Sequence, residues 1–235
     1  RTAEEDRGHC REMIRAVVFD FDGVLANSEP LHFRGYRDVL APRGVALTER
    51  SYYENYLGYD DIGAFRAIAG DFGVTFTDAD IADLVAKKAV RLEELEKSAS
   101  VLFPGAREAI ERMAAAGPVA IASGALKGEI LRVLDHEGLR GHFPIVVSAE
   151  DTPASKPDPA PYLLAAELLA ARHPGLQAAE CVSIEDSKWG LLSARAAGMK
   201  TVGISHTYPA AELADAADVV IDHLDAFTPE LLRSL

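Results

Sequence analysis

One stretch near the start of the chain, Val17-Val18-Phe19-Asp20-Phe21-Asp22-Gly23, restricts the fold more than any other. Its apolar residues predict a buried strand, and two carboxylates one residue apart follow at the carboxyl end, where α/β sheets bind ligands. Gly23 allows the backbone to leave the strand at an angle that a side chain would obstruct. The stretch therefore predicts an α/β fold with Asp20 and Asp22 at an accessible sheet edge. Taken alone, it also fits an edge strand that runs into an acidic turn.

Predicted strands and helices alternate regularly in the second half of the chain. The strands are expected at residues 119–122, 145–148, 182–184, 201–204 and 219–221, and the helices at residues 105–116, 127–136, 160–172 and 190–197. Such alternation implies a parallel sheet covered by helices on both faces and wound in right-handed crossovers. We therefore predict a Rossmann-like, doubly wound parallel sheet.

An all-helical block interrupts this pattern after the first strand. Residues 27–97 carry apolar residues at three-and-four spacing and contain no convincing strand. We predict that residues 1–26 and 98–235 form the core, with 1–12 as a flexible tail, and that 27–97 form an inserted helical cap that closes over the acidic pair. The alternative is a helical face of a single domain.

Composition limits the partners of this chain. The 235 residues are 49% hydrophobic and carry a formal net charge of −13, which repels nucleic acid and anionic membranes. An anionic substrate would need local cations, so a phosphate site here would require a metal. Two cysteines fit no disulfide framework, and no apolar run of about eighteen residues occurs. We expect a cytoplasmic monomer with neither a membrane nor a nucleic acid partner.

Polar residues that suit phosphate or metal follow three of the later strands. Ser123-Gly124 offers a hydroxyl and turn amides, Lys156 offers a cation between Ser155 and Pro157, and Glu185-Asp186 is a second acidic pair. Taken singly, each has a simpler interpretation. Ser123-Gly124 could be an ordinary turn, Lys156 a solvated surface lysine, and the second acidic pair part of a helix N-cap.

Together these signals occur in one order, with D-x-D-G, Ser, Lys and E-D each at the carboxyl end of an alternating strand. From Met13 onward the sequence resembles the haloacid dehalogenase superfamily of phosphohydrolases, in the branch with a helical cap inserted after the first motif. That branch includes β-phosphoglucomutase, phosphoglycolate phosphatase and small sugar-phosphate phosphatases. The runs 20–32, 154–159 and 184–187 are typical of it.

The resemblance implies roles for the four acids. Asp20 would attack phosphorus and form an aspartyl phosphate, and Asp22 would protonate the leaving oxygen and later take a proton from water. Mg²⁺ would be held by the Asp20 carboxylate, the Asp22 backbone carbonyl and Asp186. Glu185 would lie close to the ion, either directly or through water.

The resemblance also implies how a small phosphorylated metabolite would be bound. Ser123, the Gly124 amide and Lys156 would surround the phosphate. His32 stands where the mutase and its relatives keep a histidine beside the leaving oxygen, and Lys88 resembles a cap lysine that reaches into the site. From the sequence alone, both are also compatible with a packed or solvated helix surface.

One departure bears on the reaction. After Leu57-Gly58 the mutase has an arginine that grips the second phosphate, whereas this chain has Tyr59-Asp60-Asp61. Two acids there would repel a bisphosphate. We therefore expect a Mg²⁺-dependent phosphatase acting on a small phosphate monoester, such as a sugar phosphate or phosphoglycolate. A β-phosphoglucomutase-type mutase is the alternative. A non-catalytic binding domain is a third possibility, disfavoured because both aspartates and the lysine are present.

Overall fold

The chain divides into two compact units. The computed structural model describes residues 13–57, 59–97 and 100–235. The predicted tail at 1–12, Gly58 and the predicted start of the second core segment at 98 therefore lie outside the described residues. The first unit, here the core unit, comprises Arg1–Asn27 and Leu102–Leu235, and the second, the helical unit, comprises Ser28–Val101. Within the described ranges, no helix has the length and apolarity needed to cross a membrane.

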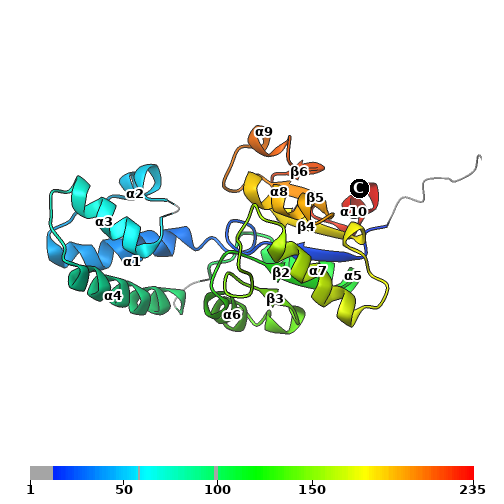
Figure 1. Ribbon diagram of the computed structural model, residues 1–235, viewed down its shortest axis with the longest axis horizontal. Coiled ribbons are helices and arrows are strands. Elements are labelled where there is room, and N and C mark those ends of the chain that lie inside the picture. Colours follow the sequence, from blue (N-terminus) through cyan, green and yellow to red (C-terminus); the bar gives the residue numbers. More distant parts are fainter. Residues whose placement is uncertain (1–12, 58, 98–99) are drawn as a thin grey trace, which may run out of the picture. The chain divides into compact units, whose positions relative to one another are not determined.

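The core unit is built on a six-stranded sheet in the order β3-β2-β1-β4-β5-β6 (Figure 1). Every neighbouring pair is parallel. The strands are β1 Ala16–Phe19, β2 Val119–Ala122, β3 Val146–Val147, β4 Cys181–Glu185, β5 Lys200–Ile204 and β6 Val219–Ile221. From β1 the chain winds outward to β3, then returns to place β4 on the other side of β1. The predicted doubly wound sheet is confirmed, and its topological switch point lies between β1 and β4.

Helices on both faces explain why β1 is apolar along its whole length. Ala16 and Val18 pack in one cluster with Tyr162 of helix α7 (Ala160–Arg172), while Phe19 makes edge-to-face contacts with Phe143 and Phe227. The helices of this unit are α5 Ala106–Ala116, α6 Lys127–His136, α7 Ala160–Arg172, α8 Lys188–Ala196, α9 Ala210–Leu213 and α10 Pro229–Ser234, with short 3-10 turns η2 Arg140–His142, η3 Ala178–Glu180 and η4 Leu224–Ala226.

The helical unit has a hydrophobic core of its own. Its helices are α1 Glu29–Leu40, α2 Glu49–Asn55, α3 Asp61–Asp71 and α4 Asp78–Glu96, with η1 Ala41–Arg43 after α1. The three-and-four spacing read from the sequence brings their apolar faces together around Tyr36, Leu40, Phe65 and Leu84. A self-contained core accounts for the compactness of this insertion.

The predicted elements differ from the observed ones mainly at their ends. The first helix starts at Glu29, inside the helical block expected from residue 27, and it carries Pro30 in its first turn, where proline is tolerated. The apolar spacing does not predict helix α2, since Tyr52 is its one buried residue. Strand β3 keeps two of the four residues expected at 145–148.

Candidate functional site

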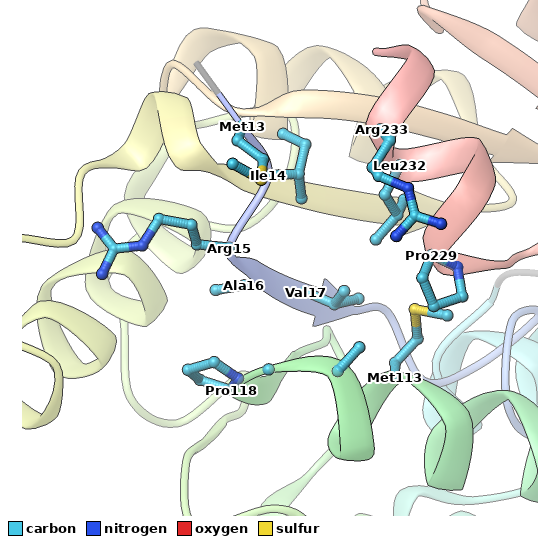
Figure 2. Close-up of a pocket in the computed structure, with 12 residues that line it drawn as sticks. Met13, Ile14, Arg15, Ala16, Val17, Met113, Pro118, Pro229, Leu232 and Arg233 are labelled. Atoms are coloured by element: carbon cyan, nitrogen blue, oxygen red, sulfur yellow. The ribbon is translucent and has the colours of Figure 1, made fainter. Parts of the chain in front are cut away.

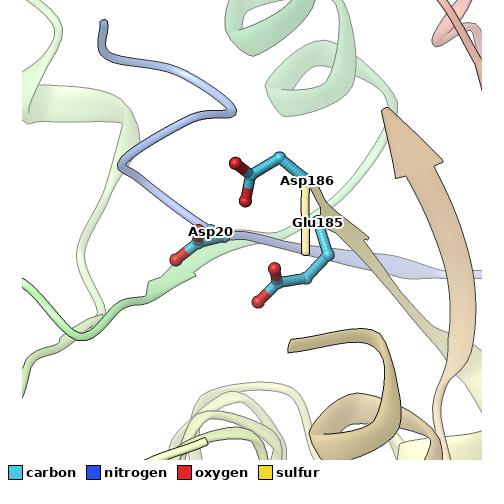
Figure 3. Close-up of side chains that lie close together, drawn as sticks. All are labelled: Asp20, Glu185 and Asp186. Carbon is cyan, nitrogen blue, oxygen red and sulfur yellow. The ribbon is translucent and has the colours of Figure 1, made fainter. Parts of the chain in front are cut away.

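Three carboxylates converge at the switch point of the sheet (Figure 3). Asp20 follows β1, Glu185 ends β4 and Asp186 follows it, and each offers an oxygen within 4.8 Å of the others. The Asp20 amide donates to the Ile184 carbonyl at 3.0 Å, which aligns the two strand ends. All three side chains are buried, Glu185 completely. The parallel register of β1 and β4 thus brings together acids that are far apart in the sequence.

Lys156 is the cation of this cluster. Its Nζ donates to Asp20 Oδ1 at 2.7 Å, to Glu185 Oε1 at 2.6 Å and to the Ala122 carbonyl at 2.9 Å, which accounts for all three ammonium donors. Burial alone would lower the pKa of Lys156, but the charges of Asp20 and Glu185 outweigh burial and raise it above its ordinary value. Lys156 is therefore a fixed ammonium beside the predicted nucleophile and not a solvated surface lysine.

Glu185 is held by several neighbours. Its Oε1 also accepts from the Tyr162 hydroxyl at 2.6 Å, and its Oε2 accepts from the Ser187 hydroxyl at 3.2 Å. Gly190 makes room for this carboxylate, since a Cβ there would lie within 2.0 Å of it. Burial and Asp20 raise the pKa of Glu185, against the opposing effects of Lys156 and Tyr162. Ser187 also caps α8 by accepting from the Gly190 amide, so part of the simpler N-cap reading is correct.

The cluster fits a hard divalent cation. Burial, followed by the charges of Asp20 and Glu185, raises the pKa of Asp186 to about 7, against a hydrogen bond from Thr207 and the charge of Lys156. Three carboxylates facing one lysine leave an excess of negative charge in a buried place. Oxygen donors at this density suit Mg²⁺, and the carboxylates of Asp20, Glu185 and Asp186 are the groups that could hold it.

The turn after Asp20 requires a glycine. Gly23 has φ of +77°, and a Cβ there would lie 1.9 Å from Asp186 Oδ2. The Gly23 carbonyl is within 2.9 Å of His206 Nδ1, so the turn is tied to the end of β5. The side chain of Asp22 is exposed and does not belong to the carboxylate cluster. Its assignment as a metal ligand, through its backbone carbonyl, stays a prediction.

The predicted phosphate-binding turn follows β2. Ser123 is buried, its amide donates to the Val147 carbonyl at 3.0 Å, and its hydroxyl accepts from the Ala125 amide at 3.2 Å. Gly124 is exposed, and a Cβ there would meet nothing within 4 Å. Lys156 bonds to the carbonyl of Ala122, the residue before Ser123. Hydroxyl, turn amide and cation therefore belong to the same edge of the sheet.

His32 and Lys88 lie in the helical unit, on α1 and α4. Lys88 is 1% exposed and forms an ion pair with Asp61, so it is not part of a wet surface. The two acids expected to repel a second phosphate have other roles within this unit. Asp60 caps α3 by accepting from the Gly63 amide at 2.6 Å, and Asp61 neutralises Lys88. Residues 59–61 include no cation, as expected. The charge of Asp61 is compensated by Lys88, so the expected repulsion of a second phosphate is wrong for Asp61.

A cavity of about 170 Å³ lies at the opposite end of the strands (Figure 2). It is lined by residues at the start of β1, including Ala16 and Val17, and by α10 residues such as Leu232. Arg15, which also lines the cavity, forms an ion pair with Glu180 at 3.1 Å. It contains none of the acids, hydroxyls or lysines described above and has no evident part in their chemistry.

Three supporting residues were missed by sequence reasoning. Tyr162 reads as an ordinary apolar position of α7, and His206 and Thr207 read as loop residues. For His206 and Thr207 the sequence did offer a signal: the loop after β5 begins at the same sheet edge as the acids. His206 also stacks on Phe103 with ring centroids 4.0 Å apart, which holds this loop.

Comparison with known proteins gives similarities across the chain. The family model "haloacid dehalogenase-like hydrolase" matches residues 14–198. Protein CbbY of Rhodobacter capsulatus is 30% identical over 232 residues, covering 94% of this chain and 99% of the relative. Hexitol phosphatase B of Escherichia coli (strain K12) is 33% identical over 191 residues, covering 80% and 82%. The crystal structure of a haloacid dehalogenase-like protein of unknown function from Agrobacterium tumefaciens has a TM-score of 0.71 at 26% identity, covering 94% and 98%.

Proposed function

Since this chain belongs to the haloacid dehalogenase-like hydrolases, we propose that it is a Mg²⁺-dependent phosphatase that hydrolyses a small phosphate monoester. The observation that carries the proposal is the position of Asp20, at the end of the central strand beside Lys156 and Asp186. The substrate would be a sugar phosphate or a phosphoglycolate-like compound. The similarity of this chain to hexitol phosphatase B supports that range.

The proposed reaction has two steps on one carboxylate. An oxygen of Asp20 attacks phosphorus, the bond from phosphorus to the leaving oxygen breaks, and Asp22 donates a proton to that oxygen. Water then attacks the aspartyl phosphate, Asp22 accepts a proton from the water, and inorganic phosphate leaves with Asp20 restored. The exposed side chain of Asp22 suits a group that exchanges protons with substrate and water.

In this proposal, the remaining residues of the site stabilise negative charge and orient the reacting carboxylate. Lys156 fixes the Asp20 carboxylate and faces the developing negative charge together with the Ser123 hydroxyl and the Gly124 amide. Bound at Asp20, Asp186 and the Asp22 carbonyl, Mg²⁺ would supply positive charge that offsets the acids and the phosphoryl oxygens. Glu185 holds Lys156 through Oε1, and its Oε2 would lie close to the ion, either directly or through water.

The helical unit would act as the cap that covers the phosphate and selects the alcohol part of the substrate. His32 and Lys88 are the residues proposed to reach that part. The proposal also includes a monomeric protein in the cytoplasm, and the cytoplasm is the expected compartment for a chain whose two cysteines fit no disulfide framework.

The test is turnover of a substrate panel by the purified protein. With Mg²⁺, phosphate should be released from sugar, polyol or glycolate phosphates. EDTA should abolish this release and added Mg²⁺ should restore it, with Ca²⁺ a poor substitute because its coordination is larger and looser. Full activity without metal would contradict the mechanism. Efficient interconversion of β-glucose 1-phosphate and glucose 6-phosphate would establish the mutase alternative instead.

A further inference from the structure

A buried ion pair lies at the centre of the helical unit. Lys88, in the middle of α4, contacts the carboxylate of Asp61 and lies 4.2 Å from the centroid of the Tyr36 ring. Gly35 of α1 leaves space for the lysine stem, since a Cβ there would lie 3.3 Å from Lys88 Cγ. A buried cation is tolerated only when its charge is matched, and Asp61 supplies that match.

Asp61 is well fixed for this role. It is the first residue of α3, and its Oδ1 accepts from the Tyr36 hydroxyl at 2.6 Å in addition to Lys88. One carboxylate therefore organises a lysine from α4 and a tyrosine from α1. The pair of Asp61 and Lys88 has no net charge, so it offers no free cation to an anionic ligand.

The same contacts assign the tautomer of His32. Lys88 Nζ lies 3.1 Å from His32 Nδ1. An ammonium group only donates hydrogen bonds, so Nδ1 is the acceptor and the proton of the neutral ring is on Nε2. Burial, then the charge of Lys88, lowers the pKa of His32 to about 4, against the opposing charge of Asp61. His32 is therefore a neutral ring that donates through Nε2.

We propose that Asp61 is a positioning residue that makes this protein select phosphate monoesters whose alcohol part is uncharged and hydroxylated, such as sugar or polyol monophosphates. Asp61 does so by neutralising Lys88 and by holding it as the donor to His32, so that the helical unit presents an N–H group instead of a cation. This inference rests on the proposed function, in which that unit covers the phosphate site. A second phosphate or a carboxylate on the substrate would find no uncompensated positive charge in this cluster.

The first test compares two substrates on the unmodified protein and on Asp61→Asn. Wild type should have a kcat/KM for a hexitol 6-phosphate at least about tenfold above that for 2-phosphoglycolate. In Asp61→Asn the amide oxygen still accepts hydrogen bonds, but the charge of Lys88 is no longer matched. The ratio should then shift toward 2-phosphoglycolate by at least about tenfold, the equivalent of one well-placed charge.

Asp60→Asn is the matched control. It makes the same change of charge one residue away, at the N-cap of α3, where asparagine is an equally good cap. Its substrate ratio should stay within about twofold of wild type. An equal shift in both variants would mean a general effect of charge and would overturn the assignment to Asp61.

A second measurement does not depend on turnover. Nitrogen-15 chemical shifts of His32 near neutral pH should show a protonated Nε2 and an unprotonated Nδ1 in wild type. A proton on Nδ1, or a doubly protonated ring, would overturn the contact scheme even if Asp61→Asn failed to fold. An unchanged substrate ratio in folded Asp61→Asn would overturn the selectivity and leave the phosphatase function intact. Absence of turnover with every monoester would instead contradict the proposed function.

Discussion

Asp20 occupies a crowded position, with two further carboxylates and one lysine around it. Asp20→Asn removes the proposed nucleophile and one negative charge without changing side-chain volume. We expect turnover of p-nitrophenyl phosphate to fall by at least about a thousandfold. In EDTA the melting temperature should equal or exceed that of wild type, because repulsion with Glu185 and Asp186 is relieved. Activity within about tenfold of wild type would contradict the assignment.

Asp22→Asn is the comparison for that variant. Its side chain is exposed and lies outside the carboxylate cluster. Turnover should fall strongly here too, but the melting temperature in EDTA should not rise. A rise equal to that of Asp20→Asn would show that the stability effect does not come from the cluster.

The hydrogen bond from Tyr162 to Glu185 can be tested by mutation. Tyr162→Phe removes the hydroxyl that donates to Glu185 Oε1 and leaves a fully buried carboxylate with one donor fewer. We expect a loss of about 1–2 kcal/mol in the free energy of unfolding, measured with urea, together with weaker binding of Mg²⁺. Tyr208→Phe, at a tyrosine that is 43% exposed, should change stability by less than about 0.5 kcal/mol. Equal losses in the two variants would contradict the role of the hydroxyl.

Helix α4 carries Lys88, and the capping box at its start can be tested by mutation. Thr77 accepts from the Asp80 amide at 3.2 Å, and Asp80 accepts in return from the Thr77 amide at 3.0 Å. Thr77→Ala should cost about 1 kcal/mol and lower the hydrogen-exchange protection of α4. Thr228→Ala, the same change at the N-cap of α10 in the core unit, should leave protection of α4 unchanged. Uniform loss of protection across both units would contradict a local cap.

The same helix start should respond to acid. Hydrogen bonds from the Thr77 hydroxyl and amide, and one from Arg43, lower the pKa of Asp80 from 3.8 to about 2. Because the folded pKa is lowered, the stabilisation is complete above the unfolded value and is lost as the pH falls toward about 2. Protection of α4, corrected for intrinsic rates, should therefore drop between about pH 5 and about pH 2.5. Asp80→Asn should lack this component, and an identical drop in that variant would contradict it.

At the scale of the whole molecule, the proposed cap must close during the reaction. The helical unit, Ser28–Val101, is joined to the core unit by its two ends. Small-angle X-ray scattering should give a smaller radius of gyration when Mg²⁺ and fluoroberyllate are added together, because this mimic of the aspartyl phosphate would hold the closed state. Asp20→Asn, which lacks the attacking oxygen, should show no change. Identical wild-type profiles with and without the mimic would count against a closing cap.

Most of the strands and helices, and the polar residues that follow the strands, could be predicted from the amino-acid sequence. These are local properties: apolar runs and helical spacing follow from backbone geometry, and residues after parallel strands share one sheet edge whatever the details of packing. The pattern alone therefore places Asp20, Ser123 and Glu185 at one edge. It does not place Lys156, which follows β3 only after a loop. It does not place Tyr162 there, because nothing local separates a tyrosine that holds a carboxylate from one that only fills a core.

The pairing of the charged side chains could be learned only from the folded structure. Lys156 and Asp20 are 136 positions apart, and Lys88 and Asp61 are 27 apart, so neither pair follows from any local period. From the sequence, Asp61 was predicted to be a free acid and Lys88 a free cation. In the structure, packing of α3 against α4 makes them one neutral pair. The ionisation and pairing of a side chain depend on its neighbours in space. Those neighbours are determined by the long-range packing of apolar faces.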